Sequence, residues 1–409
     1  MDLNSYLYLP RTGRYANPWN SNDRMPVVFG EVGIVYVSTV EAELAREPRW
    51  TLPAIAVSTG YVAGAVLGTD FCYSIGRAEL SAVDSFIYIN GVRVASSKYS
   101  VVDGHGAGDD LHMTYIHFNS SADMPNLSAG DVVTAQGRGI NYTTVSGSTI
   151  INNIGDCIEY VLTQLGTYTT SILDNVSFLE LKKKWLAVAN PNGAITEDET
   201  YWGIIQSMMA SYNGFAFING EGKLSVYSDN GIAPTNVSAV FPRKEITLIR
   251  ARQIESNLIN SLPVSYDYSR VDKEFKRHVQ LSSVYDQRSI NIFGTQEPAT
   301  PYQLHWNKSK PSTVVGPIIQ KYSFPWYEVE IEDQTLKRAH LDVGDVVAAS
   351  FRELYQKDGN QFTNRIFEII EVSPKYPEGK INFRMQELNY NLSTLGGLTT
   401  STSYDMTEY

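Results

Sequence analysis

Four runs of the sequence decide the fold of its C-terminal part: YEVEIEDQTL (327–336), LDVGDVVAASF (341–351), RIFEIIEVSP (365–374) and KINFRMQEL (380–388). In each run Val, Ile, Phe and Tyr alternate or nearly alternate with polar residues, which is the pattern of β-strands. The segments between the runs hold the Gly, Asn, Asp or Pro that chain reversals need. The runs therefore predict a small antiparallel sheet or a β-barrel-like domain.

The third run predicts apolar side chains on both faces of its strand. On a regular strand Ile366, Ile370 and Val372 point one way, and Phe367 and Ile369 point the other way. Only one of these faces can meet the core of its own domain. Ile366, Ile370 and Val372 are therefore the predicted interface residues, packing against a neighbouring subunit or another protein.

The phrase GDVV occurs twice, within LSAGDVVT (127–134) and within LDVGDVVA (341–348). Two unrelated β-turns with similar turn chemistry would explain four matched residues. The two copies also lie in β-rich regions on either side of a helical middle, so a pair of related β-domains remains an open interpretation.

The order of patterns predicts a mainly β, multidomain protein with an α+β insertion, in which tube-like β-barrel or β-sandwich domains flank a helical middle. The expected parts are an N-terminal arm (1–24), a first β-domain (25–147), a helix-rich inserted α+β domain (148–250) with a hairpin at 215–227, a connecting β segment (251–326), the C-terminal β-barrel-like domain (327–390) and a flexible tail (391–409).

Local signals support this order. Asn90-Gly91, between FIYI and VRVA, is the preferred pair for a type I′ hairpin turn. Apolar residues at helical spacing predict helices over 154–165 and 179–186. A third helix is expected after a capping box at Thr196–Glu199, with Gly214 as its C-terminal stop.

Composition narrows the function. The chain has 409 residues with 33 basic and 44 acidic side chains, a net charge of -11, which argues against nucleic-acid binding through phosphate contacts. Two cysteines, Cys72 and Cys157, are too few for a disulfide framework, so a reduced intracellular site of synthesis is expected. We expect a soluble protein, because no export signal or run of about 18 apolar residues is evident.

One stretch, DGHGAGDDLHMTYIH (103–117), is rich enough in His and Asp to suggest a metal site. His112 and His117 are five residues apart, so on one straight strand they face opposite sides. A polar hairpin loop is the favoured interpretation, and neither a metal nor a cofactor is expected. The sequence also has no Gly-x-Ser-x-Gly or His-Glu-x-x-His motif. We therefore expect no enzyme.

The surplus of 26 Tyr and 6 Trp has two interpretations. Such rings stack on sugars in carbohydrate-binding modules, and they are also enriched at protein interfaces.

The order of four segments carries a family resemblance: YNGFAFINGEGKLSVYS (212–228), NLINSLPVSYDY (257–268), SVYDQRSINIFG (283–294) and then the C-terminal runs from VGDVV onward. Over about residues 150–390 this order resembles the hub domains of tail-tip attachment proteins of long-tailed phages, and it is similar to the baseplate hubs of contractile tails.

The resemblance implies a structural virion protein, synthesised in the host cytoplasm and located in the phage tail. As a hub it would form a ring, expected to be a homotrimer, at the distal end of the tail tube. It would contact tail-tube or distal tail proteins, the tape-measure protein, and tip or fibre proteins, while genomic DNA passes through without specific binding. The resemblance also favours interfaces as the role of the aromatic surplus. The alternatives are a tail-associated carbohydrate- or peptidoglycan-acting enzyme and a host-surface glycan-binding module.

Overall fold

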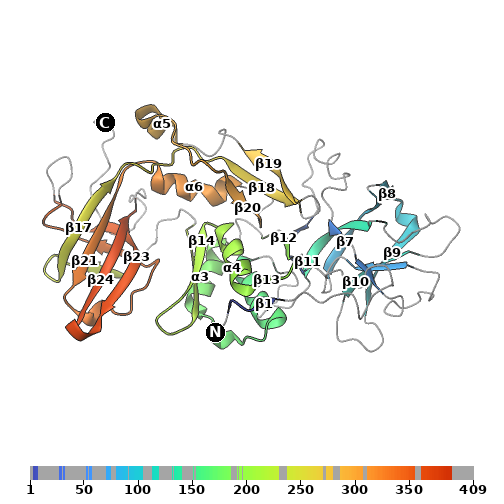
Figure 1. Ribbon diagram of the computed structural model, residues 1–409, viewed down its shortest axis with the longest axis horizontal. Helices are drawn as coiled ribbons and strands as arrows, with labels where there is room; N and C mark the ends of the chain where they lie inside the picture. The colour runs from blue at the N-terminus through green and yellow to red at the C-terminus, as the bar shows by residue number, and fades with distance from the viewer. Residues whose placement is uncertain are drawn as a thin grey trace. The chain divides into compact units, whose positions relative to one another are not determined.

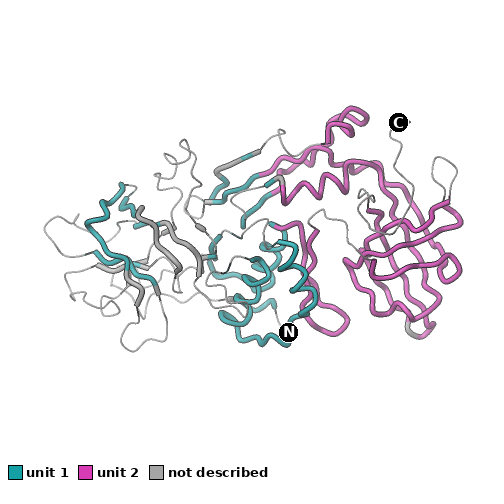
Figure 2. The backbone as a smooth tube through the Cα atoms, turned by 180° about the vertical axis from the view of Figure 1, so that it is seen from behind, with its two compact units in different colours: residues 1–211, 265–278, 303–311 teal, residues 212–264, 279–302, 312–409 magenta. Residues whose placement is uncertain are grey.

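The computed structural model confirms a mainly β, multidomain architecture with several sheets and interspersed helices (Figure 1). It describes residues 3–7, 27–29, 31–32, 52–53, 55–57, 71–74, 80–90, 92–104, 113–118, 131, 133–140, 151, 153–185, 191, 193–195, 197–229, 237–269, 273–279, 286–306, 311–354 and 361–388. Two compact units, each drawn from three stretches of chain, are present: unit 1 (1–211, 265–278 and 303–311) and unit 2 (212–264, 279–302 and 312–409) (Figure 2).

Unit 1 contains two larger antiparallel sheets. The first has the order β5 (Ile55–Val57), β6 (Phe71–Ser74), β10 (Met113–Phe118) and β9 (Tyr99–Gly104). The second has the order β3 (Glu31–Val32), β11 (Val133–Ile140), β7 (Leu80–Ile89) and β8 (Val92–Val94), and β4 (Leu52–Pro53) also pairs with β11. Asn90 has a φ of 50° between β7 and β8, which confirms the expected hairpin.

Three smaller sheets also occur in this part of the chain. β1 (Tyr6–Leu7) pairs with β13 (Glu199–Thr200), and β2 (Val27–Phe29) pairs with β12 (Gly193–Ile195). A three-stranded sheet, most of it in unit 1, has the order β19 (Glu274–Val279), β18 (Val264–Ser269) and β20 (Tyr302–Leu304).

The helices of unit 1 confirm the helical middle. They are α2 (Ile154–Tyr160), which continues as a π-helical turn over Val161–Leu165, α3 (Asn175–Trp185) and α4 (Tyr201–Ala210). The expected capping box is wrong, because α4 is capped by Thr200, whose hydroxyl accepts a hydrogen bond from the Gly203 amide at 3.0 Å.

The expected stop at Gly214 is also wrong. The C-cap of α4 is Ser211, and Gly214 already begins the hairpin of unit 2, β14 (Gly214–Ile218) with β15 (Leu224–Ser228). The left-handed residue before this hairpin is Asn213, with a φ of 50°. Asparagine tolerates that conformation better than most residues, so it replaces the expected glycine.

Unit 2 holds two helices within the segment expected to be β. They are α5 (Gln287–Phe293), capped by the Asp286 carboxylate, and α6 (Pro311–Tyr322). α6 buries Val314, Val315, Ile318 and Ile319, an apolar face at helical spacing. Its β-branched residues and the internal Pro317 are unfavourable in helices, so the sequence pattern did not predict this helix.

The C-terminal runs form a six-stranded sheet with the order β16 (Ala239–Phe241), β22 (Val346–Ala349), β23 (Arg365–Lys375), β24 (Lys380–Glu387), β21 (Trp326–Asp333) and β17 (Ile246–Ile254). Only the β16–β22 pairing is parallel. Among the described residues the two outer strands, β16 and β17, do not pair with each other, so the sheet is open. Of the two expected forms, an antiparallel sheet and a barrel-like domain, the structure has the open, mainly antiparallel sheet.

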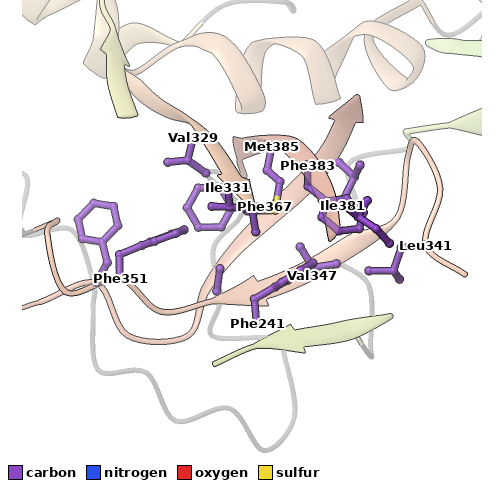
Figure 3. Close-up of a cluster of buried hydrophobic side chains, with 13 residues drawn as sticks. Phe241, Val329, Ile331, Leu341, Val347, Phe351, Phe367, Ile381, Phe383 and Met385 are labelled. Carbon is purple, nitrogen blue, oxygen red and sulfur yellow. The ribbon is translucent and has the colours of Figure 1, made fainter. Parts of the chain in front are cut away.

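One face of this sheet, here called the inner face, packs on a hydrophobic core (Figure 3). Its buried members include Phe241, Val347, Phe367, Phe383 and Val329, which come from five of the six strands. The rings of Phe241 and Phe383 meet edge to face with centroids 5.3 Å apart. The opposite face, here called the outer face, is therefore the one that can contact other segments of the chain or other molecules.

Within the part of the chain that the structure describes, no helix is long and apolar enough to cross a membrane. The expected tail (391–409), residues 127–130 of the first GDVV copy, and most of the expected N-terminal arm lie outside the described residues.

Candidate interaction surface on the six-stranded sheet

Two β-bulges determine which side chains reach the outer face. The register of β17 shifts between Leu248 and Arg250, and the register of β23 shifts between Ile369 and Glu371. Ile249 and Ile370 are the extra residues. A bulge turns the side chains that follow it to the other face of the strand, so sequence alternation no longer predicts the direction of those side chains.

The three predicted interface residues do not share a face. Ile366 is only 2% exposed and packs with Ala348 and Leu388 in a small second cluster. Val372, which follows the bulge, packs against the inner core instead. Ile370 lies half-buried in the bulge itself. The expectation that all three point one way is wrong because the bulge inverts the alternation; participation of Ile370 in an interface remains a prediction.

A row of alternating charges crosses the outer face. The strand registers align Arg250 of β17 with Glu330 of β21, Glu330 with Arg384 of β24, and Arg384 with Glu371 of β23. Both bulges lie beside this row. Opposite charges on neighbouring strands stabilise a sheet and oppose its slipping, so the row helps to specify the strand register.

Ion pairs hold two of these four charges, Arg384 and Glu371, together with the neighbouring Glu328 and Arg252. Glu328 accepts from Arg384 Nε at 2.6 Å and lies 2.9 Å from Arg252, while Arg384 lies 3.3 Å from Glu371. Partial burial alone would raise the pKa of Glu328, but hydrogen bonds from Arg384 and Arg252 hold that pKa below its ordinary value.

A second pairing on the same face has a similar effect. Glu332 accepts a hydrogen bond from Lys380 Nζ at 2.7 Å, and Lys375 lies 3.7 Å away. The hydrogen bond from Lys380 is the main cause that lowers the pKa of Glu332. These carboxylates are therefore ionised at neutral pH and bound to cations of their own sheet.

Arg250 and Glu330 differ from their neighbours in the row. Although they face each other in register, neither side chain forms an ion pair or hydrogen bond with any other described residue. They lie in a groove of about 340 Å³. The groove is lined by Arg250, Arg252, Glu328, Val329, Glu330, Glu371, Ser373, Asn382 and Arg384.

The groove reaches the edge of the sheet. Among the described strands β17 pairs only with β21, and Thr247, Ile249, Arg250, Arg252 and Gln253 on β17 are exposed. An edge strand is a template for pairing with another chain, and natural proteins restrict such pairing with charges and bulges. β17 has both devices, so they limit which partner can dock there.

Helix α6 closes the other end of the outer face. Its Lys321 donates a hydrogen bond to Glu368 of β23, and both residues are buried. Burial is the main cause that raises the pKa of the nearby Tyr227 hydroxyl, and the charge of Glu368 raises it further. The part of the outer face left open is therefore the groove over β17, β21 and β24.

Within the described residues no group of three or more His, Cys, Asp or Glu side chains is placed to hold a metal ion. Of the cluster considered in the sequence, His117 is buried on β10, where it faces Cys72 of β6 and Ser100 of β9. His105, Asp109, Asp110 and His112 lie outside the described residues.

No family model and no curated protein matches this sequence. Among solved structures, the chain is similar to a chain from the virion of a native gene transfer agent particle, with a TM-score of 0.49 and 12% sequence identity over 94% of this chain and 90% of that one.

Two bacterial tail proteins are also similar to this chain. One is the tail protein from Neisseria meningitidis MC58, with a TM-score of 0.30 and 12% identity over 78% of this chain and 87% of that one. The other is a prophage tail protein from Listeria monocytogenes EGD-e, with a TM-score of 0.32 and 10% identity over 80% and 86% of the two chains.

Proposed function

We propose that this chain is a structural virion protein of a phage tail, a hub that forms a ring at the tail tip or baseplate through its C-terminal sheet. The observation that carries the ring contact is the outer groove. There Arg250, on an exposed edge strand, and Glu330, on the next strand, lie side by side without an ion-pair or hydrogen-bond partner among the described residues. The order of sequence segments supports the assignment to tails.

The groove suits another copy of the same chain. It presents a cation and an anion together, so each copy carries both halves of a complementary pair. Arg250 of one copy can then meet Glu330 of the next copy. A head-to-tail contact of this kind closes into a ring when the rotation between successive copies allows it. Three copies are the number that the hub resemblance implies.

The wider assignment follows from the same resemblance. The ring would join the tail tube or distal tail proteins to tip or fibre proteins, enclose the path of the tape-measure protein and DNA, and have no enzymatic role. A general acid or base must exchange protons near the working pH. On this sheet Glu328 and Glu332 have pKa values lowered by ion pairs, which suits a fixed charge and not proton transfer.

The charge of each groove residue can be reversed to test the ring. We expect the purified chain to sediment as a trimer at high concentration, and Arg250→Glu and Glu330→Arg each to weaken association by at least about tenfold, since like charges then meet across the contact. The double reversal restores complementarity and should recover most of the association.

Lys223→Glu is the matched control, because Lys223 is an exposed cation of the β14–β15 hairpin with a local partner, Glu221. Circular dichroism at the sedimentation temperature separates loss of association from loss of fold. A wild-type chain that remains monomeric at high concentration and is not annular in assembled tails contradicts the ring. Unchanged association in both single variants contradicts the groove as its contact.

A further inference from the structure

The free edge of β17 is long, and no described strand covers it (Figure 1). β17 has nine residues and pairs only with β21, and no described residue outside β21 forms a hydrogen bond with its main chain. The other outer strand, β16, has only three residues, and Arg338 already binds the carbonyl oxygen of Val240 there. β17 is therefore the edge that can accept a further strand.

The row of alternating charges on the outer face ends at this edge on a cation. From β23 to β17 it consists of Glu371, Arg384, Glu330 and Arg250. Arg250 has no ion-pair or hydrogen-bond partner among the described residues. Opposite charges on neighbouring strands stabilise a sheet. A strand with an acidic residue opposite Arg250 would continue the row by one step.

The inner face of β17 is incompletely covered. Ile246, Leu248 and Ala251 pack against the hydrophobic core, but each remains partly exposed. A further strand with apolar side chains on this face would bury them more completely, which favours its docking. The strand that suits this edge therefore carries an acidic residue on its outer face and apolar residues on its inner face.

A segment after β24 has this pattern in its sequence. Residues 399–409 read TTSTSYDMTEY and are rich in Thr and Tyr, which favour strands. On a regular strand Asp405 points to one face, and Tyr404 and Met406 point to the other. The stretch 389–409, which lies outside the described residues, contains two acidic residues and no Lys or Arg.

The strand registers place the end of β24 close to the end of β17. Gln386 of β24 lies beside Glu328 of β21, and Glu328 lies beside Arg252 of β17. Both β24 and β17 are antiparallel to β21, so they run in the same direction and end at the same end of the sheet. A chain that leaves β24 and turns back can therefore pair antiparallel with β17.

The chain is long enough to reach this edge. The free side of β17 lies three strand spacings from β24, about 14 Å. The stretch from Leu388 to Asp405 can span up to about 55 Å, since an extended chain covers about 3.3 Å per residue. Gly396 and Gly397 lie within it and favour the reversal that antiparallel pairing needs.

We propose that residues 399–409 add to the free edge of β17 of the same chain as an antiparallel strand, with Asp405 opposite Arg250 and with Tyr404 and Met406 on the inner face. Attachment to the same chain keeps the effective concentration of the segment at the edge high. The added strand extends the sheet sideways and leaves the outer groove uncovered. It does not require the proposed ring.

Amide hydrogen exchange tests the proposal by comparing the full chain with a chain that ends at Tyr390, at a concentration where sedimentation shows monomers. The amides of β17 should exchange at least about tenfold faster after the truncation, because the added strand no longer protects them. β22 and β24 are paired on both sides, so they are internal references and should not change.

Charge variants test the register of the added strand. Asp405→Lys and Arg250→Glu should each speed the exchange of β17 at least about fivefold, because like charges then meet. The double variant should restore most of the protection. Glu408→Lys is the matched control, since it makes the same charge change on the other face of the segment. It should leave the protection of β17 in place.

Exchange of β17 that is unchanged by the truncation overturns the proposal. Faster exchange of β22 and β24 to the same extent also overturns it, because the segment would then stabilise the whole sheet. Equal effects of Asp405→Lys and Glu408→Lys contradict the pairing of Asp405 with Arg250. Protection that rises with protein concentration overturns pairing within one chain and assigns the edge to another copy. Because exchange is measured on monomers, failure of the ring in sedimentation leaves these results unaffected.

Discussion

At the residue scale, Arg338 connects the two outer strands of the open sheet. Its Nε donates to the carbonyl oxygen of Val240 on β16, and its guanidinium pairs with Glu245, the residue just before β17. It also donates two hydrogen bonds of 3.1 Å to Asp333, which is fully buried. The guanidinium lies 4.8 Å from the centroid of the Phe241 ring.

Replacing this cation should destabilise unit 2 strongly. We expect Arg338→Met to lower the free energy of unfolding by about 3–5 kcal/mol, because the buried Asp333 carboxylate loses its counter-charge. Urea unfolding measures the change. Replacing both partners, in Arg338→Met with Asp333→Leu, should recover much of the loss, since no charge is then left buried.

The neighbouring Lys337→Met is the control. Lys337 is largely exposed and lies 3.7 Å from Glu245, so its loss should cost less than about 1 kcal/mol. If Arg338→Met and Lys337→Met had equal effects, Arg338 would be a surface cation and not a structural link.

At the element scale, the second GDVV turn depends on Gly344. This residue has a φ of 92°, and its amide donates to the Ile369 carbonyl oxygen at 2.8 Å, which ties the turn to β23. Asp345 closes the turn by accepting from the Asp342 amide at 2.8 Å. A Cβ on Gly344 would lie 2.7 Å from the Tyr227 ring, so β15 approaches the turn closely.

A pair of glycine substitutions separates backbone strain from this close approach. Gly379 also has a positive φ, 65°, but a Cβ there meets no atom within 4 Å. Gly379→Ala should therefore cost about 1 kcal/mol of unfolding free energy, from backbone strain alone.

Gly344→Ala should cost at least about 2 kcal/mol more, because the added methyl group also displaces the Tyr227 ring. Urea unfolding of the two variants gives the comparison. Equal losses would mean that Tyr227 moves aside freely and that the packing of β15 on the turn contributes little.

At the scale of the whole molecule, charge decides how the protein meets DNA. The net charge is -11, and on the six-stranded sheet Arg252, Arg384 and Lys380 already bind carboxylates. Cations that are already paired with carboxylates are less able to bind DNA phosphates. Binding to phosphates releases counterions, and this release is the main source of nonspecific DNA affinity.

The purified chain should therefore show no DNA retention in a gel-shift assay at about 50 mM salt, where electrostatic binding is strong. This behaviour is required of a ring through which DNA passes. Binding that weakens steeply as salt is added would contradict the passive path, because it would reveal a basic surface. Arg252→Glu should leave the result unchanged.

Several elements were predictable from the sequence because their causes are local. Asn90 adopts the positive φ that its hairpin turn needs, and the hairpin expected at 215–227 forms from β14 and β15. The helical spacing over 154–165 and the alternating runs of 327–388 also gave the correct element types. Such signals act within a few residues, through backbone sterics and side-chain periodicity.

The sites depended on tertiary structure. The bulge at Ile370 sends Val372 into the core, and it arises only in the pairing of β23 with β24. Arg250 and Glu330 are 80 positions apart in the sequence, and only the register of β17 with β21 brings them together. The sequence by itself therefore determined the type of most elements and the mainly β class. The tertiary structure decided which faces are open, because that depends on strand register and on contacts between segments far apart in the chain.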